Sequence, residues 1–506
     1  MKTNRFLNPA SIEGSAKMKT TARAIAVALA VGACFAPGAA SAFTSGSTGA
    51  DGAFSPTVNT TVALPPSGIF NYTSVNIPAG VTVKFLRNTT NTPVVILATG
   101  DVTIGGTLDV SGTSGASVGA AGDGAIGDDG NPGLGGPGGF DGGRGGAGGV
   151  TPVIGGVGLG PGGGNGSTFA SPSNFCIGGQ PSGGGGGGYF SAGTNGSVCL
   201  TSAPSAGGPA YGSATILPLI GGSGGGGGGG GPSLFGTGGG GGGGAILIAA
   251  SGTITVNGTI NANGGSSGTT SSNGAGSNGG GGAGGAVRMI ASTLTGNGPI
   301  NAVAGGSGGG GQQAGGAGST GRIRLEADNF NRTAVTNPAA IVATTGPVFV
   351  AGSPTLAISS VAGVPAPANP TGSADVTLPS STPNPVTVVF TTTGVPVGNT
   401  VQLTLVPAFG AKTVVISPAL TGSTASATAS VSVSLPVGPS VLQAQTTFTI
   451  VASLGDLLRN FAGNERVERI TLTASLGGKS KATLITVSGK EYDAPDEALR
   501  IAAMGG

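Results

Sequence analysis

Few side chains in this sequence are suited to catalysis. The 506 residues include no His and no Trp, and only 20 basic and 18 acidic residues. Glycoside hydrolysis needs two carboxylates about 5–10 Å apart. The candidate pairs are Asp101 with Asp109, and Asp128 or Asp129 with Asp141. Asp109 lies between two apolar residues of a predicted strand, so we expect its side chain to face solvent.

Calcium is the other chemistry that the carboxylates suggest. Asp123, Asp128, Asp129 and Asp141 fall in one Gly-rich stretch and could supply oxygen ligands. They follow neither EF-hand spacing nor a regular Asp-bearing repeat, so they are weak calcium candidates. We expect no catalytic residue, no bound metal and no cofactor.

The N-terminus has the pattern of an export signal. Positively charged residues precede the apolar run Ala24–Phe35, and the small residues Ala40–Ala42 form a cleavage site. We expect translation to start at Met18, cleavage after Ala42, and a secreted or cell-surface protein. Lipidation at Cys34 is the alternative. No later apolar run reaches about 18 residues, so no transmembrane helix is expected.

The mature chain would retain two cysteines, Cys176 and Cys199. In an exported protein we expect them to form a disulfide, and two free thiols are the alternative. From residue 43 onward there are 15 basic and 17 acidic residues. Because no cluster of Lys and Arg with interleaved aromatic residues occurs, nucleic acid is not an expected partner.

Strand-like alternation recurs along the first two thirds of the chain. "VVILATGDVTIGGTLDVSG" (94–112) recurs as "AILIAASGTITVNGTINANGG" (245–265) and as "AVRMIASTLTGNGPINAVAGG" (286–306). The cores of these blocks, residues 102–110, 254–262 and 294–302, superpose without gaps. Such self-similarity predicts a repeat architecture in which stacked units share one core. We expect a parallel β-solenoid over residues 43–330, with a core that includes Val102, Ile104, Leu108, Leu247, Ile254, Val256 and Ile260.

Gly-rich tracts fall between the repeated strands. Residues 124–148 have Gly at every third position, whereas other tracts are nearly pure Gly. Three structures remain open for these insertions. They are polyglycine-II-like helices packed side by side, with three residues per turn, mobile loops, and a collagen trimer. Phe140, Leu134 and Arg144 would need outward space in the first of these.

The amino-acid composition changes after residue 330. Residues 338–451 contain evenly spaced alternating runs with Pro and Gly turns, which predicts an Ig-like antiparallel β-sandwich. Residues 452–506 carry more charge and predict a small α+β tail. The overall expectation is a mainly β protein with three regions after the signal.

The repeats "VNIPAGVTVKF" and "ATGDVTIGGTLDVSG" resemble those of the right-handed parallel β-helix of pectin-lyase-like proteins, and more narrowly those of Gly-rich exported bacterial surface proteins. The resemblance covers about residues 69–330. It implies that a polysaccharide lyase must be considered. "RIR", with Arg322 and Arg324, is similar to the basic motif of that family but lacks the surrounding carboxylates and His.

The sequence therefore favours an exported structural or adhesive protein without catalytic activity. Polysaccharide or other cell-surface components are the expected partners. A carbohydrate-active enzyme on a β-helix is the alternative. A third hypothesis is an ice- or surface-binding protein, because Thr253 and Thr255 alternate on one predicted strand.

Overall fold

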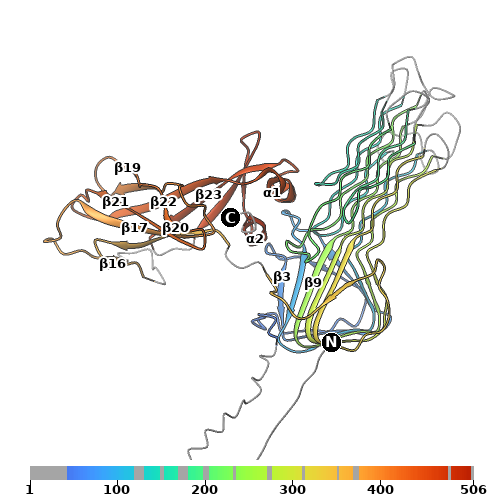
Figure 1. Ribbon diagram of the computed structural model, residues 1–506, viewed down its shortest axis with the longest axis horizontal. Coiled ribbons are helices and arrows are strands. Elements are labelled where there is room, and N and C mark those ends of the chain that lie inside the picture. The colour runs from blue at the N-terminus through green and yellow to red at the C-terminus, as the bar shows by residue number, and fades with distance from the viewer. Residues whose placement is uncertain are drawn as a thin grey trace, which may run out of the picture. The chain divides into compact units, whose positions relative to one another are not determined.

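Figure 1 shows the computed structural model of the chain. The structure describes residues 43–118, 130–148, 153–168, 181–197, 204–231, 235–270, 276–309, 314–349, 353–367, 375–476 and 480–502. All of these lie in one compact unit, Ala42–Gly506. The described chain is mainly β, with two parallel and two antiparallel sheets.

The two parallel sheets contain the repeats. The first sheet has nine strands: β1 (Ala53–Phe54), β3 (Ile69–Tyr72), β4 (Ser74–Ile77), β6 (Val94–Ala98), β7 (Val102–Ile104), β9 (Ala245–Val256), β11 (Ala286–Thr295), β13 (Arg322–Phe330) and β14 (Ile341–Ala343). The second has five: β2 (Thr60–Ala63), β5 (Thr82–Leu86), β8 (Thr107–Asp109), β10 (Thr259–Asn261) and β12 (Ile300–Asn301).

The register of these sheets follows the sequence alignment of the repeats. Val102 lies opposite Ile254, which lies opposite Leu294. In the second sheet Leu108 lies opposite Ile260, which lies opposite Ile300. All of these strand pairs are parallel, because each repeat runs through the two sheets in the same direction. Between β9 and β11 the register shifts by one residue between Ala291 and Thr293.

Apolar side chains of the two sheets share a core. Alternate residues of a strand point to the same face, and the inward ones are almost completely buried. Six of the seven expected core residues lie in this cluster, namely Val102, Ile104, Leu108, Ile254, Val256 and Ile260.

The assignment of Leu247 to the expected solenoid core is wrong. It is buried, but it packs against Val95, Tyr189 and Ile216 on the other face of the first sheet. Its neighbours Ile246 and Ile248 point into the shared core, so alternation directs Leu247 the opposite way. The sequence could not show this second buried face, because residues far along the chain cover it.

Fourteen Gly-rich segments run side by side and are joined by backbone hydrogen bonds (Figure 1). We number them 1–14 in chain order: 111–118, 130–136, 139–148, 153–159, 162–168, 181–188, 192–197, 204–209, 221–231, 235–244, 262–270, 276–285, 302–309 and 314–321. We call them together the Gly array.

Donors in the array rotate with a period of three residues. In segment 10, Gly239 and Gly242 donate to segment 3, whereas Gly240 and Gly243 donate to segment 12. The intervening Gly241 donates to segment 1. Three residues per turn is the periodicity of a polyproline-II-type helix, so each segment can bond partners on every side.

The position of a segment in the array agrees with its composition. Segments 6, 9, 10 and 12 are each hydrogen-bonded to six other segments, and these contain the long runs of Gly. In segments at the edge of the array, residues other than Gly occur at every third position or more often. Segment 3, for example, presents Asp141, Arg144 and Ala147.

Backbones in the array approach too closely for a side chain. A Cβ atom on Gly136 would lie 2.0 Å from the carbonyl oxygen of Val110, and one on Gly228 would lie 1.9 Å from that of Ser277. Both distances are well below van der Waals contact. Most interior positions therefore accept only Gly.

The small polar side chains inside the array replace backbone hydrogen-bonding groups. The Ser277 hydroxyl donates to the carbonyl of Ser182 at 2.7 Å and accepts the N–H of Gly229 at 2.8 Å. The Thr237 hydroxyl accepts the N–H of Gly279 at 2.8 Å. These buried polar groups are satisfied, as a dry interior requires.

The C-terminal region contains two antiparallel sheets. One has five strands: β15 (Thr355–Val361), β16 (Val364–Pro365), β17 (Val386–Thr393), β20 (Thr421–Ser423) and β21 (Ser426–Val433). The other has six: β18 (Gln402–Pro407), β19 (Thr413–Ile416), β22 (Ser440–Thr449), β23 (Val467–Ser475), β24 (Lys481–Thr486) and β25 (Glu491–Asp493).

Two expected domain boundaries are corrected. The boundary at residue 452 separates β22 from β23, yet these strands pair antiparallel in one sheet. Helices α1 (Ala452–Leu457) and α2 (Asp496–Ala502) contribute to the same core as the sheets. The expected start of the β-sandwich at residue 338 lies too early in the chain, because β14, which follows it, still pairs with β13 in the first parallel sheet. The charged composition of the tail reflects its exposed face.

Replacing one interior Gly tests the packing of the array. We expect Gly228→Ala to lower the free energy of unfolding by about 1–3 kcal/mol or more, because the methyl group has no space. Gly306→Ala is the matched control. Its Cβ would meet only the Ser266 hydroxyl, at 3.5 Å, so its melting temperature should be unchanged or slightly raised. Equal melting temperatures for the two variants would contradict this packing.

Candidate functional site

The carboxylates that could support hydrolysis are bonded to backbone groups. Asp101 Oδ1 accepts the N–H of Thr253 at 2.7 Å. Asp109 Oδ1 accepts the N–H of Ser111 at 3.0 Å, and its Oδ2 lies 3.6 Å from Lys84 Nζ. The Asp101 contact connects the chain before β7 to β9, and the Asp109 contact lies at the end of β8. Both carboxylates therefore have a structural role.

Asp141 is the one calcium candidate within the described residues. It accepts hydrogen bonds from the Arg87 guanidinium and from the N–H of Gly135. Asp123, Asp128 and Asp129 lie outside the described residues. In the part of the chain that the structure describes, no three His, Cys, Asp or Glu side chains gather to hold a metal ion.

The two arginines of the "RIR" motif are also engaged. Arg322 lies over the rings of Tyr189 and Phe190, 5.5 and 5.0 Å from their centroids. Arg324 donates to Glu326 at 2.6 Å. Burial raises the pKa of Tyr189, against the effect of Arg322, so its hydroxyl stays protonated. It donates to the carbonyl of Ile220 at 2.9 Å.

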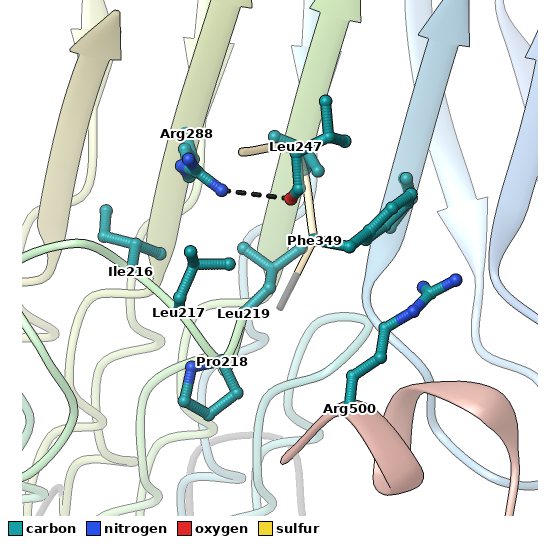
Figure 2. A pocket seen from close by; sticks show the side chains of 10 residues that line it. Ile216, Leu217, Pro218, Leu219, Leu247, Arg288, Phe349 and Arg500 are labelled. Carbon is teal, nitrogen blue, oxygen red and sulfur yellow. Dashed lines mark hydrogen bonds between the residues drawn. The ribbon is translucent and has the colours of Figure 1, made fainter. Parts of the chain in front are cut away.

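A small pocket lies over the outer face of the first parallel sheet (Figure 2). Its lining includes Leu247, Arg288, Phe349 and Arg500, together with Ile216–Leu219. It has room for no more than a water-sized molecule, whereas small-molecule sites are much larger. The pocket is therefore too small for a substrate.

The edge of the Gly array carries a group of exposed aliphatic side chains. Leu134 of segment 2 is 56% exposed, and Val153, Ile154 and Val157 of segment 4 are 51%, 52% and 56% exposed. We call these four residues the aliphatic stripe. Exposed apolar residues that gather on one face indicate a contact surface more often than isolated ones do.

Segment 3 lies between the two segments that carry the stripe. Gly142 donates to the carbonyl of Gly133 in segment 2 at 2.8 Å, and Gly156 of segment 4 donates to Arg144 at 2.7 Å. The exposed Arg144 donates in turn to Asn131 Oδ1. The four residues of the stripe thus lie on the two segments that flank segment 3, which carries the exposed Arg144. The sequence did not lead us to predict the aliphatic stripe, although it shows aliphatic residues between pairs of Gly.

Polar side chains on another edge of the array have a structural role. The hydroxyl of Ser111 accepts the N–H of Asn263 at 3.1 Å, and that of Ser117 accepts the N–H of Thr269 at 3.0 Å. The Ser266 hydroxyl accepts the N–H of Gly306 at 3.2 Å. Each of these side chains bonds the backbone of the next segment. The polar residues on this edge are therefore explained by the packing of the array and do not indicate a binding partner. The aliphatic stripe has no comparable role in the array.

Among the described residues, no helix is both long enough and apolar enough to span a membrane.

Cys176 and Cys199 lie outside the described residues, but the segments that flank them are in contact. The N–H of Thr168 donates to the Ser182 hydroxyl at 3.0 Å. The hydroxyls of Ser182 and Ser205 lie 3.1 Å apart, and the N–H of Gly196 donates to Ser205 at 2.9 Å. The two connections that carry the cysteines therefore begin and end on adjoining segments.

We expect a disulfide between Cys176 and Cys199 in the mature protein. Alkylation of the denatured, unreduced chain should add no mass, and alkylation after reduction should add two alkyl groups. Cys176→Ser should expose one free thiol at Cys199. Two alkyl groups added without reduction would contradict the disulfide.

The chain matches no protein-family model, no curated protein and no solved structure. Its function must therefore be argued from its own residues.

Proposed function

We propose that this chain is an exported, non-catalytic structural and adhesive protein of the cell surface or extracellular matrix. In this proposal the two parallel sheets form a β-solenoid, and the Gly array is a bundle of polyglycine-II-like helices built on it. The two antiparallel sheets form an Ig-like β-sandwich that serves as a spacer or a second binding module. The apolar N-terminal segment directs export.

The observation that carries this proposal is that most interior positions of the array have no space for a side chain, and that Ser277 and Thr237, which do lie inside, are hydrogen-bonded to backbone groups. A Cβ at Gly228 or Gly136 would overlap a carbonyl oxygen, so the interior cannot house a catalytic group. Binding chemistry is confined to residues at the edge. An array of this kind supports a rigid surface better than it supports a reaction.

The aliphatic stripe is the contact surface that we assign to adhesion. Its four side chains are more than half exposed, and segments 2 and 4, which carry them, are held by backbone hydrogen bonds to segment 3. A preorganised surface loses little conformational entropy on binding. Cell-surface or matrix components with apolar patches are the partners that it fits.

Serine substitutions in the stripe test the proposed contact. We expect Leu134→Ser, Ile154→Ser and Val157→Ser together to reduce retention of the purified protein on an alkyl-coated surface several-fold. The melting temperature should change little, because exposed positions contribute little to stability. Retention and melting are measured on the same preparations.

The matched control replaces exposed polar residues on another edge, Ser114→Ala and Ser307→Ala. Retention of this variant should equal that of the parent protein. Equal retention of the stripe variant and the parent would overturn the assignment of adhesion to the stripe. Cleavage of a polysaccharide by the purified parent protein would overturn the non-catalytic function itself.

Binding of a flat, ordered surface such as ice is a second candidate, favoured by the register of the first parallel sheet. Thr253 lies opposite Thr293, and Thr255 lies opposite both Thr295 and Thr103. These five residues form two columns on one face. Thermal hysteresis of the parent protein, abolished by Thr255→Val with Thr295→Lys, would support this candidate. Absence of hysteresis in the parent protein would exclude it.

A further inference from the structure

Residues 345–349, which we call the strap, cross the outer face of the first parallel sheet after β14. Side chains of β11 and β13 hold the strap through its backbone. Arg288 donates to the carbonyl of Pro347 at 2.8 Å and to that of Val348 at 3.1 Å. Glu326 Oε2 accepts the N–H of Gly346 at 2.9 Å.

Arg288 and Glu326 are almost completely buried, with side chains 2% and 0% exposed. They form a paired contact in which Arg288 Nε and Nη2 donate to the two oxygens of Glu326, at 2.9 and 3.2 Å. A buried ion pair is tolerated when further hydrogen bonds satisfy its remaining groups. Here the backbone of the strap supplies those bonds.

Without the strap, the pair would lose three hydrogen-bond partners. Water would have to replace the strap at two donor positions of the guanidinium and at one carboxylate lone pair. Hydrogen bonds to charged groups contribute more to stability, net of water, than bonds between neutral groups do. The pair therefore favours the docked strap by the net value of three such bonds.

Apolar contacts complete the site. Val348 and Phe349 pack against the cluster that contains Leu247 and Ile216. Figure 2 shows Arg288 directed at the strap, with Phe349 between the sheet and Arg500 of α2. The guanidinium of Arg500 lies 3.7 Å from the centroid of the Phe349 ring, within the range of a cation–π contact.

We propose that Arg288 and Glu326 form a main-chain clamp that binds an extended peptide, and that the strap is its ligand in the same chain. The clamp recognises two consecutive carbonyls and one N–H, in the direction fixed by Gly346–Val348. It anchors the linker that leads from the parallel sheets into the antiparallel sheets. This role is independent of adhesion through the stripe.

Hydrogen exchange of the strap amides in the full chain tests the clamp. In the parent protein we expect slow exchange at Gly346. Arg288→Met with Glu326→Met removes both charges of the buried pair together. Arg324, whose side chain is 16% exposed, then loses its contact with Glu326, and Arg324→Met is added to the double variant to remove that charge as well. In this variant exchange at Gly346 should be at least about tenfold faster, while peptides from segments 9 and 10 keep their protection.

A strap variant covers the case in which the triple variant does not fold. Gly346→Pro removes the N–H that Glu326 accepts and leaves both charges in place. It should make the strap accessible to proteases, with hydrogen-exchange protection of the array retained.

Arg324→Met is the matched control, because among the described residues Arg324 bonds Glu326 and not the strap. Its strap should exchange like that of the parent. Fast exchange at Gly346 in the parent protein, or unchanged strap protection in both the triple variant and Gly346→Pro, would overturn the proposal.

Discussion

The Gly array depends on how closely its backbones approach one another. At Gly228 and many similar positions, a single added carbon would lie within about 2 Å of a neighbouring carbonyl oxygen. At such separations each segment can exchange N–H···O bonds with several partners. The array therefore has an interior held by backbone hydrogen bonds, where most domains have an interior of packed apolar side chains.

This constraint connects position to composition. An interior segment is surrounded on all sides and admits mainly Gly, with Ala283 and a few polar side chains that replace a backbone bond, as Ser277 does. An edge segment has one open side, and other residues occupy the positions that face it. The triplet pattern of residues 130–148 belongs to segments at the edge, whereas the pure Gly runs belong to the interior.

Ordering so much Gly is entropically unfavourable, since Gly loses more backbone freedom than any other residue. Each net hydrogen bond contributes only about 0.5–1.5 kcal/mol. The parallel sheets offset part of the entropy, because strands such as β9 and β11 hold the ends of the segments that precede or follow them. Where strands hold the ends of neighbouring segments, those segments begin in register with one another. Less backbone entropy is then lost when they form hydrogen bonds.

The repeats were the most informative part of the sequence. Apolar alternation predicted the strands, and the gapless alignment corresponds to the observed pairing of Val102 with Ile254. Leu247 was assigned to the wrong core, although it is seven residues from Ile254 and alternation directs it outward; its burial depends on residues far along the chain that cover the outer face. The expected boundary at residue 452 failed because a change in charge was taken for a change of domain, although β22 and β23 pair.

The arrangement of the Gly segments and the clamp lay beyond the reach of the sequence. A run of Gly has no side-chain pattern from which neighbours can be inferred, so packed helices, mobile loops and a collagen trimer stayed open. The partners of Arg288 and Glu326 are backbone groups of the strap, which no residue type encodes. Cys176, Cys199 and three of the four calcium candidates fall outside the described residues and stay predictions.

Hydrogen exchange of the interior Gly segments tests the central claim most directly. Peptides covering residues 221–231, 235–244 and 276–285 contain few side chains, so protection must come from backbone bonds, except at Gly229 and Gly279, whose amides donate to the hydroxyls of Ser277 and Thr237. The array described above predicts that these amides exchange only through cooperative opening, as slowly as those of β9 and β11. Exchange of these segments at the rate of an unstructured peptide would show that they are loops and would contradict the account.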